Sequence, residues 1–198
     1  MPIIEHLRNK VRRGRMSRLL RRFLGDRRGV AAIEFVMLAL PFFLFIFAIL
    51  ETCLSFAAQQ VLSNAMDDAA REIRTGKDWT KTITETRLKE AICDHFEIIS
   101  INCLGSDNLS VDLQSYDTFQ LAAADDFVVK SGVIYIKRGA ALLSPSVSPV
   151  SAGKIYTLRV FYKWPVITDI MRPYLANIDS NKTLLFATIT WKNEPFDD

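Results

Sequence analysis

Glu34 is the one charged side chain within the most apolar stretch of the chain. Residues 35–50 contain no polar side chain, and residues 30–33 continue the apolar character on the other side of Glu34. Inside a membrane helix a carboxylate costs about 2.5–3.5 kcal/mol at the middle and less near an end, so such residues are usually paired or functional. Glu34 is therefore a candidate for an ion pair. The alternative is a carboxylate that reaches the nearby membrane surface without a partner.

The three cysteines offer a second kind of chemistry. Cys93 and Cys103 are ten residues apart, and in an oxidising compartment they would form the most economical disulfide, closing a small loop. Cys53 is left over and could crosslink subunits, although a packed free thiol is the commoner outcome. Metal binding is disfavoured, because His95 is the only histidine after the apolar stretch and there is no second cysteine pair. No metal or other cofactor is expected.

The sequence after the apolar stretch has no pattern typical of catalysis. It contains no Gly-rich phosphate loop, no nucleophile elbow and no metal-ligand pair. The adjacent carboxylates Asp125-Asp126 and Asp197-Asp198 are typical of a solvated turn or tail rather than of a catalytic or Ca²⁺ site. We therefore expect that the protein is not an enzyme.

The apolar stretch itself has the length of a membrane span. Residues 30–50 as a helix would be about 31 Å long, against about 30 Å for a hydrocarbon core. A buried core helix is the alternative, but a soluble helix normally shows one polar face. Residues 1–29 carry ten Lys and Arg against two acidic residues, so the positive-inside rule predicts a cytoplasmic N-terminus and a periplasmic chain from Glu51 onward. This basic run predicts contact with anionic lipids rather than with nucleic acid.

The residues around the start of the span carry a family resemblance. Residues 27–35, RRGVAAIEF, resemble the type IV prepilin signature, and more narrowly the TadE-like pseudopilins of the tight-adherence (Flp-type) pilus. In that family a prepilin peptidase cuts after the glycine and leaves a glutamate at position five and an aromatic residue at position six. The resemblance implies a cut between Gly29 and Val30, with Glu34 and Phe35 in the matching positions. Glu34 would then pair with the new Val30 amine of a neighbouring subunit and fix the axial register.

The helix is expected to continue beyond the membrane. Residues 56–73 place apolar side chains at three- and four-residue spacings among polar ones, which indicates an amphipathic stem. We expect the stem to end near Thr75-Gly76, where glycine can supply a left-handed cap. Pro41 removes one backbone donor inside the span, so a kink is expected there.

The rest of the chain predicts an α+β, pilin-like fold in which the long helix packs on a small antiparallel sheet. A helix is expected over residues 83–96, followed by about four strands. The segments with strand character are residues 109–113, 127–129, 133–136, 156–162 and 185–191. Residues 143–153, with Pro145 and Pro149, predict a loop or hairpin connection, and residues 165–175 a short helix with its loop. Residues 191–196 are again similar to the end of TadE-like domains. The predicted organisation is a leader (1–29), a span (30–50), a stem (51–76) and a periplasmic domain (77–198).

The function implied by the resemblance is that of a minor pilin or pseudopilin in assembly of a tight-adherence pilus, and hence in adhesion and biofilm formation. Its expected partners are the prepilin peptidase, other pilin subunits, the pilus assembly platform and inner-membrane lipids. The alternative is an uncleaved single-pass scaffold of the same machinery. A third possibility, an adhesive tip subunit, would depend on the exposed faces of the periplasmic domain.

Overall fold

The structure is a computed structural model that describes residues 29–76, 83–96, 103, 107–169, 171–178 and 181–195. The chain forms two compact units, Met1–Phe47 and Ala48–Asp198. The basic leader before Gly29 lies outside the described residues, as does Asp197-Asp198. The predictions about those segments therefore stay predictions.

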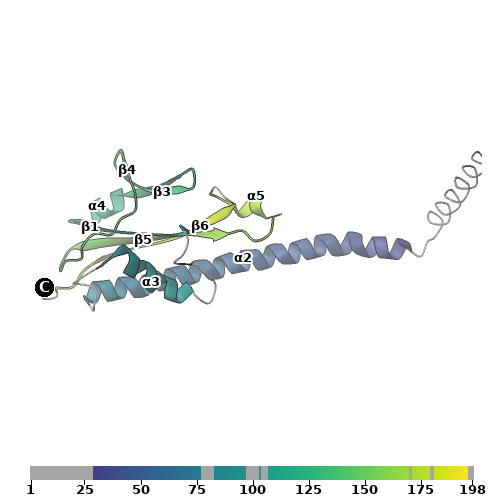
Figure 1. Cartoon of the computed structure of the whole chain (residues 1–198), viewed down its shortest axis with the longest axis horizontal. Helices are drawn as coiled ribbons and strands as arrows, with labels where there is room; N and C mark the ends of the chain where they lie inside the picture. The colour runs from purple at the N-terminus through teal and green to yellow at the C-terminus, as the bar shows by residue number, and fades with distance from the viewer. Residues whose placement is uncertain are drawn as a thin grey trace, which may run out of the picture. The chain divides into compact units, whose positions relative to one another are not determined.

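The long N-terminal helix, α2, runs from Val30 to Thr75 without interruption, as the sequence predicts (Figure 1). It ends in a left-handed glycine: Gly76 has a φ of 69°, and its N–H donates to the carbonyl of Ile73 at 3.2 Å. Glycine adopts this conformation without the steric cost that most other residues meet, which favours a helix end here. Within the described ranges, α2 is the one helix whose length and hydropathy would allow it to cross a membrane.

A three-stranded antiparallel sheet forms the centre of the second unit. Its strands are β1 (Leu109–Tyr116), β5 (Ile155–Pro165) and β6 (Lys182–Lys192), in the order β1-β5-β6. In this register Tyr116 and Lys192 lie opposite Ile155, while Lys182 lies opposite Pro165. The two ends of β5 therefore define the two ends of the sheet.

One face of this sheet is covered by the stem portion of α2 and by α3 (Glu85–Phe96) (Figure 1). The stem contributes a stripe of small and aliphatic side chains, and α3 adds Leu88, Ile92 and Phe96, all three fully buried. They meet alternate residues of β5, from Tyr156 to Trp164, in one apolar cluster. Burial of this cluster is the main stabilising contribution to the unit, since each fully buried large apolar side chain is worth about 1.5–3 kcal/mol.

The opposite face is covered by a second sheet. The sequence predicts strands at residues 127–129 and 133–136, but not that they form a sheet of their own. Its strands are β2 (Asp126–Lys130), β3 (Val133–Arg138) and β4 (Ala141–Leu143), in the order β2-β3-β4. Phe161 of β5 packs against Ile134 and Ile136 of this sheet, and its ring lies 5.0 Å from that of Phe127. The expectation of about four strands was therefore wrong, because the described chain has six strands in two sheets. The α+β, pilin-like fold class is confirmed.

Two short helices complete the unit. The first, α4 (Phe119–Ala124), follows β1 and is capped by the hydroxyl of Thr118, which accepts from the N–H of Leu121. The second, α5 (Arg172–Leu175), follows β5 and has no buried residue. Between β4 and β5, the predicted loop lies along the outer edge of β1, where Leu113 pairs with Ser146 and Ser148 through backbone hydrogen bonds. This contact covers an edge that would otherwise expose unpaired backbone groups.

The stem is attached along the whole length of the central sheet. At its far end the Arg74 carbonyl accepts from the N–H of Glu194, just beyond β6. In the middle, the side-chain amide of Gln59 donates to the carbonyl of Phe186 at 2.9 Å. The lengths match, since 24 helical steps from Glu51 to Thr75 give about 36 Å and ten strand steps along β5 give about 33 Å.

Candidate assembly site on the stem helix

Gly29 lies immediately before α2, and the described chain gives no structural reason for a glycine there. A Cβ added at Gly29 would meet nothing within 4 Å, and its φ is not in the left-handed region. By contrast, Gly139 and Gly153 have φ values of 60° and 69°, a conformation that other residues adopt only with strain. Within the described residues, neither backbone conformation nor packing requires a glycine at position 29.

Glu34 lies on the second turn of α2 among exposed apolar side chains. Phe35 beside it is 69% exposed and Val30, one turn earlier, is 47% exposed. Because residues four apart lie on the same helix face, Val30 and Glu34 present their groups on one side. Within the described part of the chain, no hydrogen bond or ion pair involves the Glu34 carboxylate. The geometry thus leaves this carboxylate available to a cation from another molecule.

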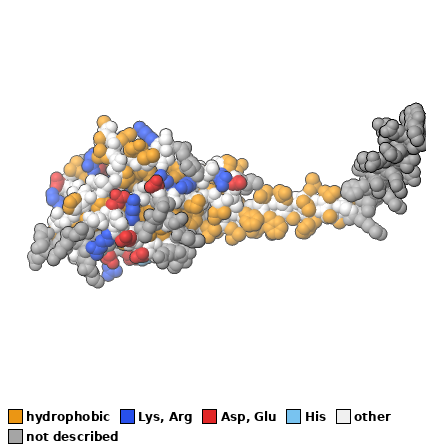
Figure 2. All heavy atoms as spheres, in the orientation of Figure 1, with side chains coloured by type: hydrophobic (Ala, Val, Ile, Leu, Met, Phe, Trp, Pro, Cys, Tyr) orange, Lys and Arg blue, Asp and Glu red, His pale blue; other side chains and the backbone are white. Residues whose placement is uncertain are grey.

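The apolar side chains of α2 are uncovered from Val30 to Leu50. None of these residues is buried, and all are exposed except Ala39 and Ala48, which are half-buried. Figure 2 shows the hydrophobic side chains along this half of the helix. Pro41 lies inside the helix, which is continuous around it. The kink predicted at Pro41 stays a prediction.

Glu51, the first residue after the apolar stretch, is a site that sequence reasoning missed. Its side chain is buried, with 4% of the residue exposed. One carboxylate oxygen accepts from the N–H of Ile167 at 2.6 Å, and the other accepts from the N–H of Thr168 at 3.2 Å and from the Thr168 hydroxyl. Glu51 thus holds the loop after β5 against the stem. Its spacing of seven and fourteen residues from the buried Ala58 and Ala65 is the signal that places it on the packed face.

The cysteines occupy two different environments. Cys93 and Cys103 form a disulfide with a Cα–Cα distance of 5.6 Å, and both are buried in the core. This bond ties the end of α3 to the segment that leads into β1. Cys53 is a free, exposed thiol on the stem, two residues after Glu51.

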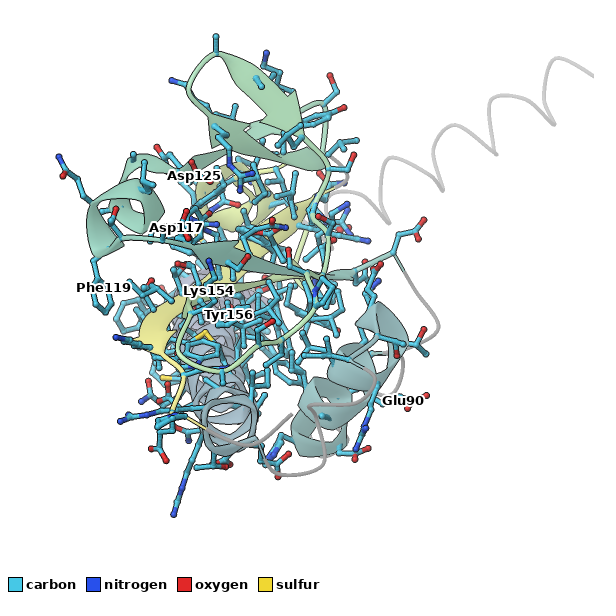
Figure 3. All side chains as sticks on the ribbon, turned by 90° about the vertical axis from the view of Figure 1, so that its left-hand side faces the viewer. Glu90, Asp117, Phe119, Asp125, Lys154 and Tyr156 are labelled. Atoms are coloured by element: carbon cyan, nitrogen blue, oxygen red, sulfur yellow. A yellow bond between two sulfur atoms is a disulfide. The ribbon has the colours of Figure 1, made fainter. Side chains whose placement is uncertain are left out.

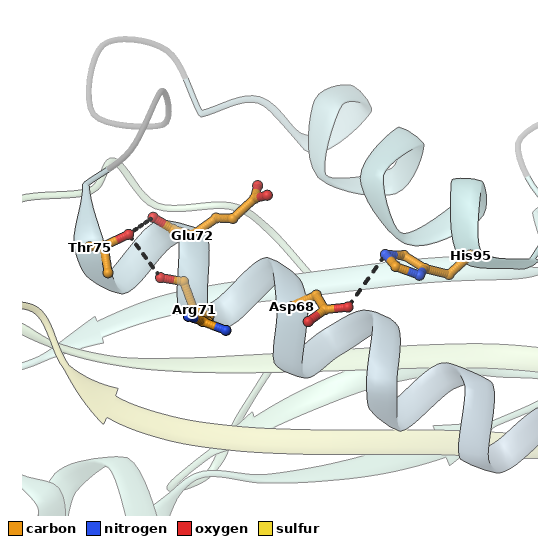
Figure 4. A pocket seen from close by; sticks show the side chains of 5 residues that line it. All are labelled: Asp68, Arg71, Glu72, Thr75 and His95. Carbon is orange, nitrogen blue, oxygen red and sulfur yellow. Dashed lines mark hydrogen bonds and ion pairs between the residues drawn. The ribbon is translucent and has the colours of Figure 1, made fainter.

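An open pocket of about 730 Å³ lies between the end of the stem and α3, lined by Asp68, Arg71, Glu72, Thr75 and His95 (Figure 4). His95 Nε2 lies 3.7 Å from an oxygen of Asp68, so a protonated imidazole would bridge the two helices. The Thr75 hydroxyl is turned back onto the carbonyls of Arg71 and Glu72. Over the described residues, no group of three or more His, Cys, Asp or Glu side chains could hold a metal ion.

Asp125 is not in a solvated turn, so that interpretation of Asp125-Asp126 was wrong for the first of the two residues. Its side chain is only 5% exposed. It accepts from the Tyr116 hydroxyl at 2.6 Å and from Arg138 Nε at 2.7 Å. Burial, followed by the hydrogen bond to Asp125, raises the pKa of Tyr116, and the same carboxylate raises the pKa of Arg138. This network joins the ends of β1, α4 and β3.

A second buried pair lies beside this network, between the two sheets. Arg159 Nη1 donates to Asp112 at 3.2 Å, and both side chains are almost fully buried. Arg159 also donates to the backbone carbonyl of Asp125. The exposed pair Lys154–Asp117, at 2.7 Å, lies at the same end of the domain, where hydrogen bonding to Lys154 lowers the pKa of Asp117 (Figure 3). These charged groups are used to hold the fold together.

The structure therefore has a pilin-like arrangement: an apolar helix that continues, without a break, into a stem packed on an antiparallel sheet. The sequence model of the family described as TadE-like protein matches residues 29–71. The chain is TadE-like over this segment, which begins at Gly29 and includes Glu34, Phe35, Pro41 and Glu51, and the resemblance is confirmed there. Neither the curated proteins nor the solved structures gave a match to the chain. The likeness of residues 191–196 to the end of TadE-like domains lies outside the matched residues and stays a prediction.

Proposed function

We propose that the protein is a minor pilin or pseudopilin that takes part in assembly of a tight-adherence pilus, anchored once in the bacterial inner membrane. The TadE-like family indicates a component of that pilus system, and the uncovered apolar helix indicates a membrane anchor. The arginine-rich N-terminus favours a cytoplasmic leader and a periplasmic domain. Roles in adhesion and biofilm formation would follow from the pilus to which the subunit contributes.

The observation that carries the proposal is the pair formed by Gly29 and Glu34 at the start of α2. The fold as described requires no glycine at position 29, and a prepilin peptidase that cuts after a glycine would supply the requirement. Cutting there creates an ammonium at Val30, four residues before a carboxylate that has no partner among the described residues. The new charge at Val30 and the old one at Glu34 are therefore complementary between neighbouring subunits.

Processing is tested by intact mass. Protein purified from cells that possess the prepilin peptidase should lack residues 1–29, and protein from cells without the enzyme should retain them. Gly29→Ala should block the cut and leave the thermal unfolding of the domain unchanged, because nothing in the described structure contacts this position. Gly139→Ala is the matched control: it should strain a left-handed turn, with φ of 60°, and leave processing intact. A full-length mass in peptidase-positive cells would contradict the pilin proposal.

The ion pair is tested separately from the cut. Glu34→Gln keeps the size of the side chain and removes its charge, so processing should continue while assembly of the subunit into pili is lost. Glu34→Asp should restore part of the assembly. If Glu34→Gln entered pili at the wild-type level, the proposed pairing with the Val30 amine would be wrong.

The alternative is an uncleaved single-pass scaffold of the pilus machinery, which would use the same span, stem and domain. The intact mass decides between the two. In either case we propose structural rather than catalytic work, because the buried charged side chains Glu51, Asp112, Asp125 and Arg159 each hold elements of the fold together. Partners would be the prepilin peptidase, other pilin subunits, the assembly platform and inner-membrane lipids, and not nucleic acid.

A further inference from the structure

If residues 30–50 span the inner membrane as proposed above, the loop after β5 is fixed at the periplasmic surface of that membrane. Glu51 is the first residue after an apolar stretch whose helical length matches the hydrocarbon core. Its carboxylate holds the backbone N–H groups of Ile167 and Thr168. Residues 167 and 168 therefore lie within one hydrogen bond of the point where the helix leaves the hydrocarbon.

Two large apolar side chains at this end of the domain are highly exposed. From β1 to the last described residue, Tyr174 and Ile167 are the two most exposed large apolar side chains, at 81% and 63%. Tyr174 belongs to α5, a four-residue helix with no buried residue. That helix is held at the same end of the sheet, because the Leu175 carbonyl accepts from the hydroxyl of Thr183, which lies opposite Trp164 in the register.

A third exposed side chain lies at a similar height on the stem. Phe56 is 70% exposed and follows Glu51 by five residues, which is about 7.5 Å along the helix. Each headgroup region of a bilayer is about 5–7.5 Å thick, as the difference between about 30 Å of hydrocarbon and about 40–45 Å in total implies. Tyrosine and tryptophan side chains are enriched in this region, where an apolar ring and a polar group are both accommodated.

We propose that Phe56, Ile167 and Tyr174 form a lipid-docking surface that lies in the headgroup region of the periplasmic leaflet. The surface rests on the proposed membrane anchor and adds a second attachment to it. Glu51 is its positioning residue, because it fixes the loop of Ile167 at the membrane surface while making no contact with lipid itself. A neighbouring subunit is the competing occupant of the same side chains, and the experiment separates the two.

The experiment uses the full chain with the Cys93–Cys103 disulfide intact and Cys53→Ser, so that a single new thiol can be labelled. Ile167→Cys and Tyr174→Cys each carry an environment-sensitive fluorophore, in phosphatidylcholine nanodiscs that hold one chain per disc. Spin-labelled lipids with the nitroxide near the headgroup should quench both labels at least twofold more than a label at Phe119→Cys. Phe119 is a matched control because it is 54% exposed and follows β1 at the opposite end of β5 (Figure 3).

Two further measurements make the result decisive. A label at Leu44→Cys should be quenched by a nitroxide deep in the acyl chains; if it is not, the proposed anchor fails and the docking surface with it. If Leu44 is quenched but the labels at 167 and 174 behave like the one at 119, the anchor stands and the lipid-docking surface is wrong. If the labels at positions 167 and 174 are shielded from water only when a disc holds several chains, the surface belongs to a contact with a neighbouring subunit. That result would overturn the lipid proposal.

Discussion

Replacing Glu51 by alanine should detach the loop after β5 from the stem and destabilise the domain by about 2–3 kcal/mol. The substitution leaves the N–H groups of Ile167 and Thr168 without their acceptor, and a buried donor without a partner costs about 1–3 kcal/mol. About 1–1.5 kcal/mol applies to each donor, the low end of that range, because the Ile167 side chain is 63% exposed and water can approach the loop. The Thr168 hydroxyl can rotate toward solvent and adds little.

For a unit of this size, 1 kcal/mol corresponds to about 2–4 °C in Tm, so the expected decrease is roughly 4–12 °C. The assay is thermal unfolding of the full chain in detergent, followed by near-ultraviolet circular dichroism. Glu51→Gln keeps one accepting oxygen and should lose about half as much. Glu34→Ala is the matched control, since that carboxylate has no partner among the described residues, and it should leave Tm unchanged. An equal Tm for Glu51→Ala and the wild type would refute the reasoning from the hydrogen bonds.

Three further predictions concern the same domain. Replacing Cys93 and Cys103 together by serine should lower the free energy of unfolding by about 3 kcal/mol, because the disulfide closes a short loop in the unfolded chain; urea unfolding with and without reductant measures this, and no difference would contradict it. Phe161→Ala should cost about 3–5 kcal/mol, since Phe161 is fully buried between the two sheets; a smaller loss than for the exposed Phe119→Ala would contradict that packing. The pKa of Tyr116 is raised in the folded state. The contribution of this tyrosine to the free energy of unfolding is therefore fully present below the pKa of an unfolded tyrosine, about 10. That contribution is lost as the pH rises through the pKa of the folded state. Urea unfolding at pH 7 and pH 11 should therefore show a smaller pH-dependent loss in Tyr116→Phe than in the wild type.

The helical part of the structure could be predicted because its signals are local. The uninterrupted apolar stretch, the three- and four-residue spacing of the stem and the glycine after Thr75 each depend on residues close together in sequence. The strand faces that pack on the stem were predictable for the same reason, since Tyr156, Leu158 and Tyr162 alternate with other residues. These features lie on the face of the sheet that meets the helices.

The strand character of residues 127–129 and 133–136 could be predicted, but not that these strands, β2 and β3, form a separate sheet with β4. β4 has three exposed residues and no alternation, so it carries no periodic signal. Thr157 and Arg159, on the face of β5 that points away from the stem, are buried although both are polar. The charge of Arg159 is tolerated there because Asp112 lies across the strand register at the same level. Arg159 and Asp112 are 47 residues apart in the chain, so the residues around each of them do not reveal the ion pair.

The candidate site divides in the same way. Glu34 was identified because an acidic residue in an apolar stretch is conspicuous whatever the fold. Glu51 was overlooked because a carboxylate at the end of a span is unremarkable until the loop of Ile167 and Thr168 is placed against it. The spacing of Glu51 from Ala58 and Ala65 could have placed it on the packed face of the helix. It could not have identified Ile167 and Thr168 as its hydrogen-bond donors.

The three attachments of the stem, at Glu51, Gln59 and Arg74, also determine how the subunit responds to a mechanical pull. They are spread over the whole contact between α2 and the central sheet, and the helix axis runs along the strands. A force directed along the axis therefore strains these bonds and the interlocked core side chains together, in shear, rather than opening them one after another as peeling would. Under tension the domain and its stem should move as a single folded body, and rupture should be governed by the unfolding rate of the whole unit.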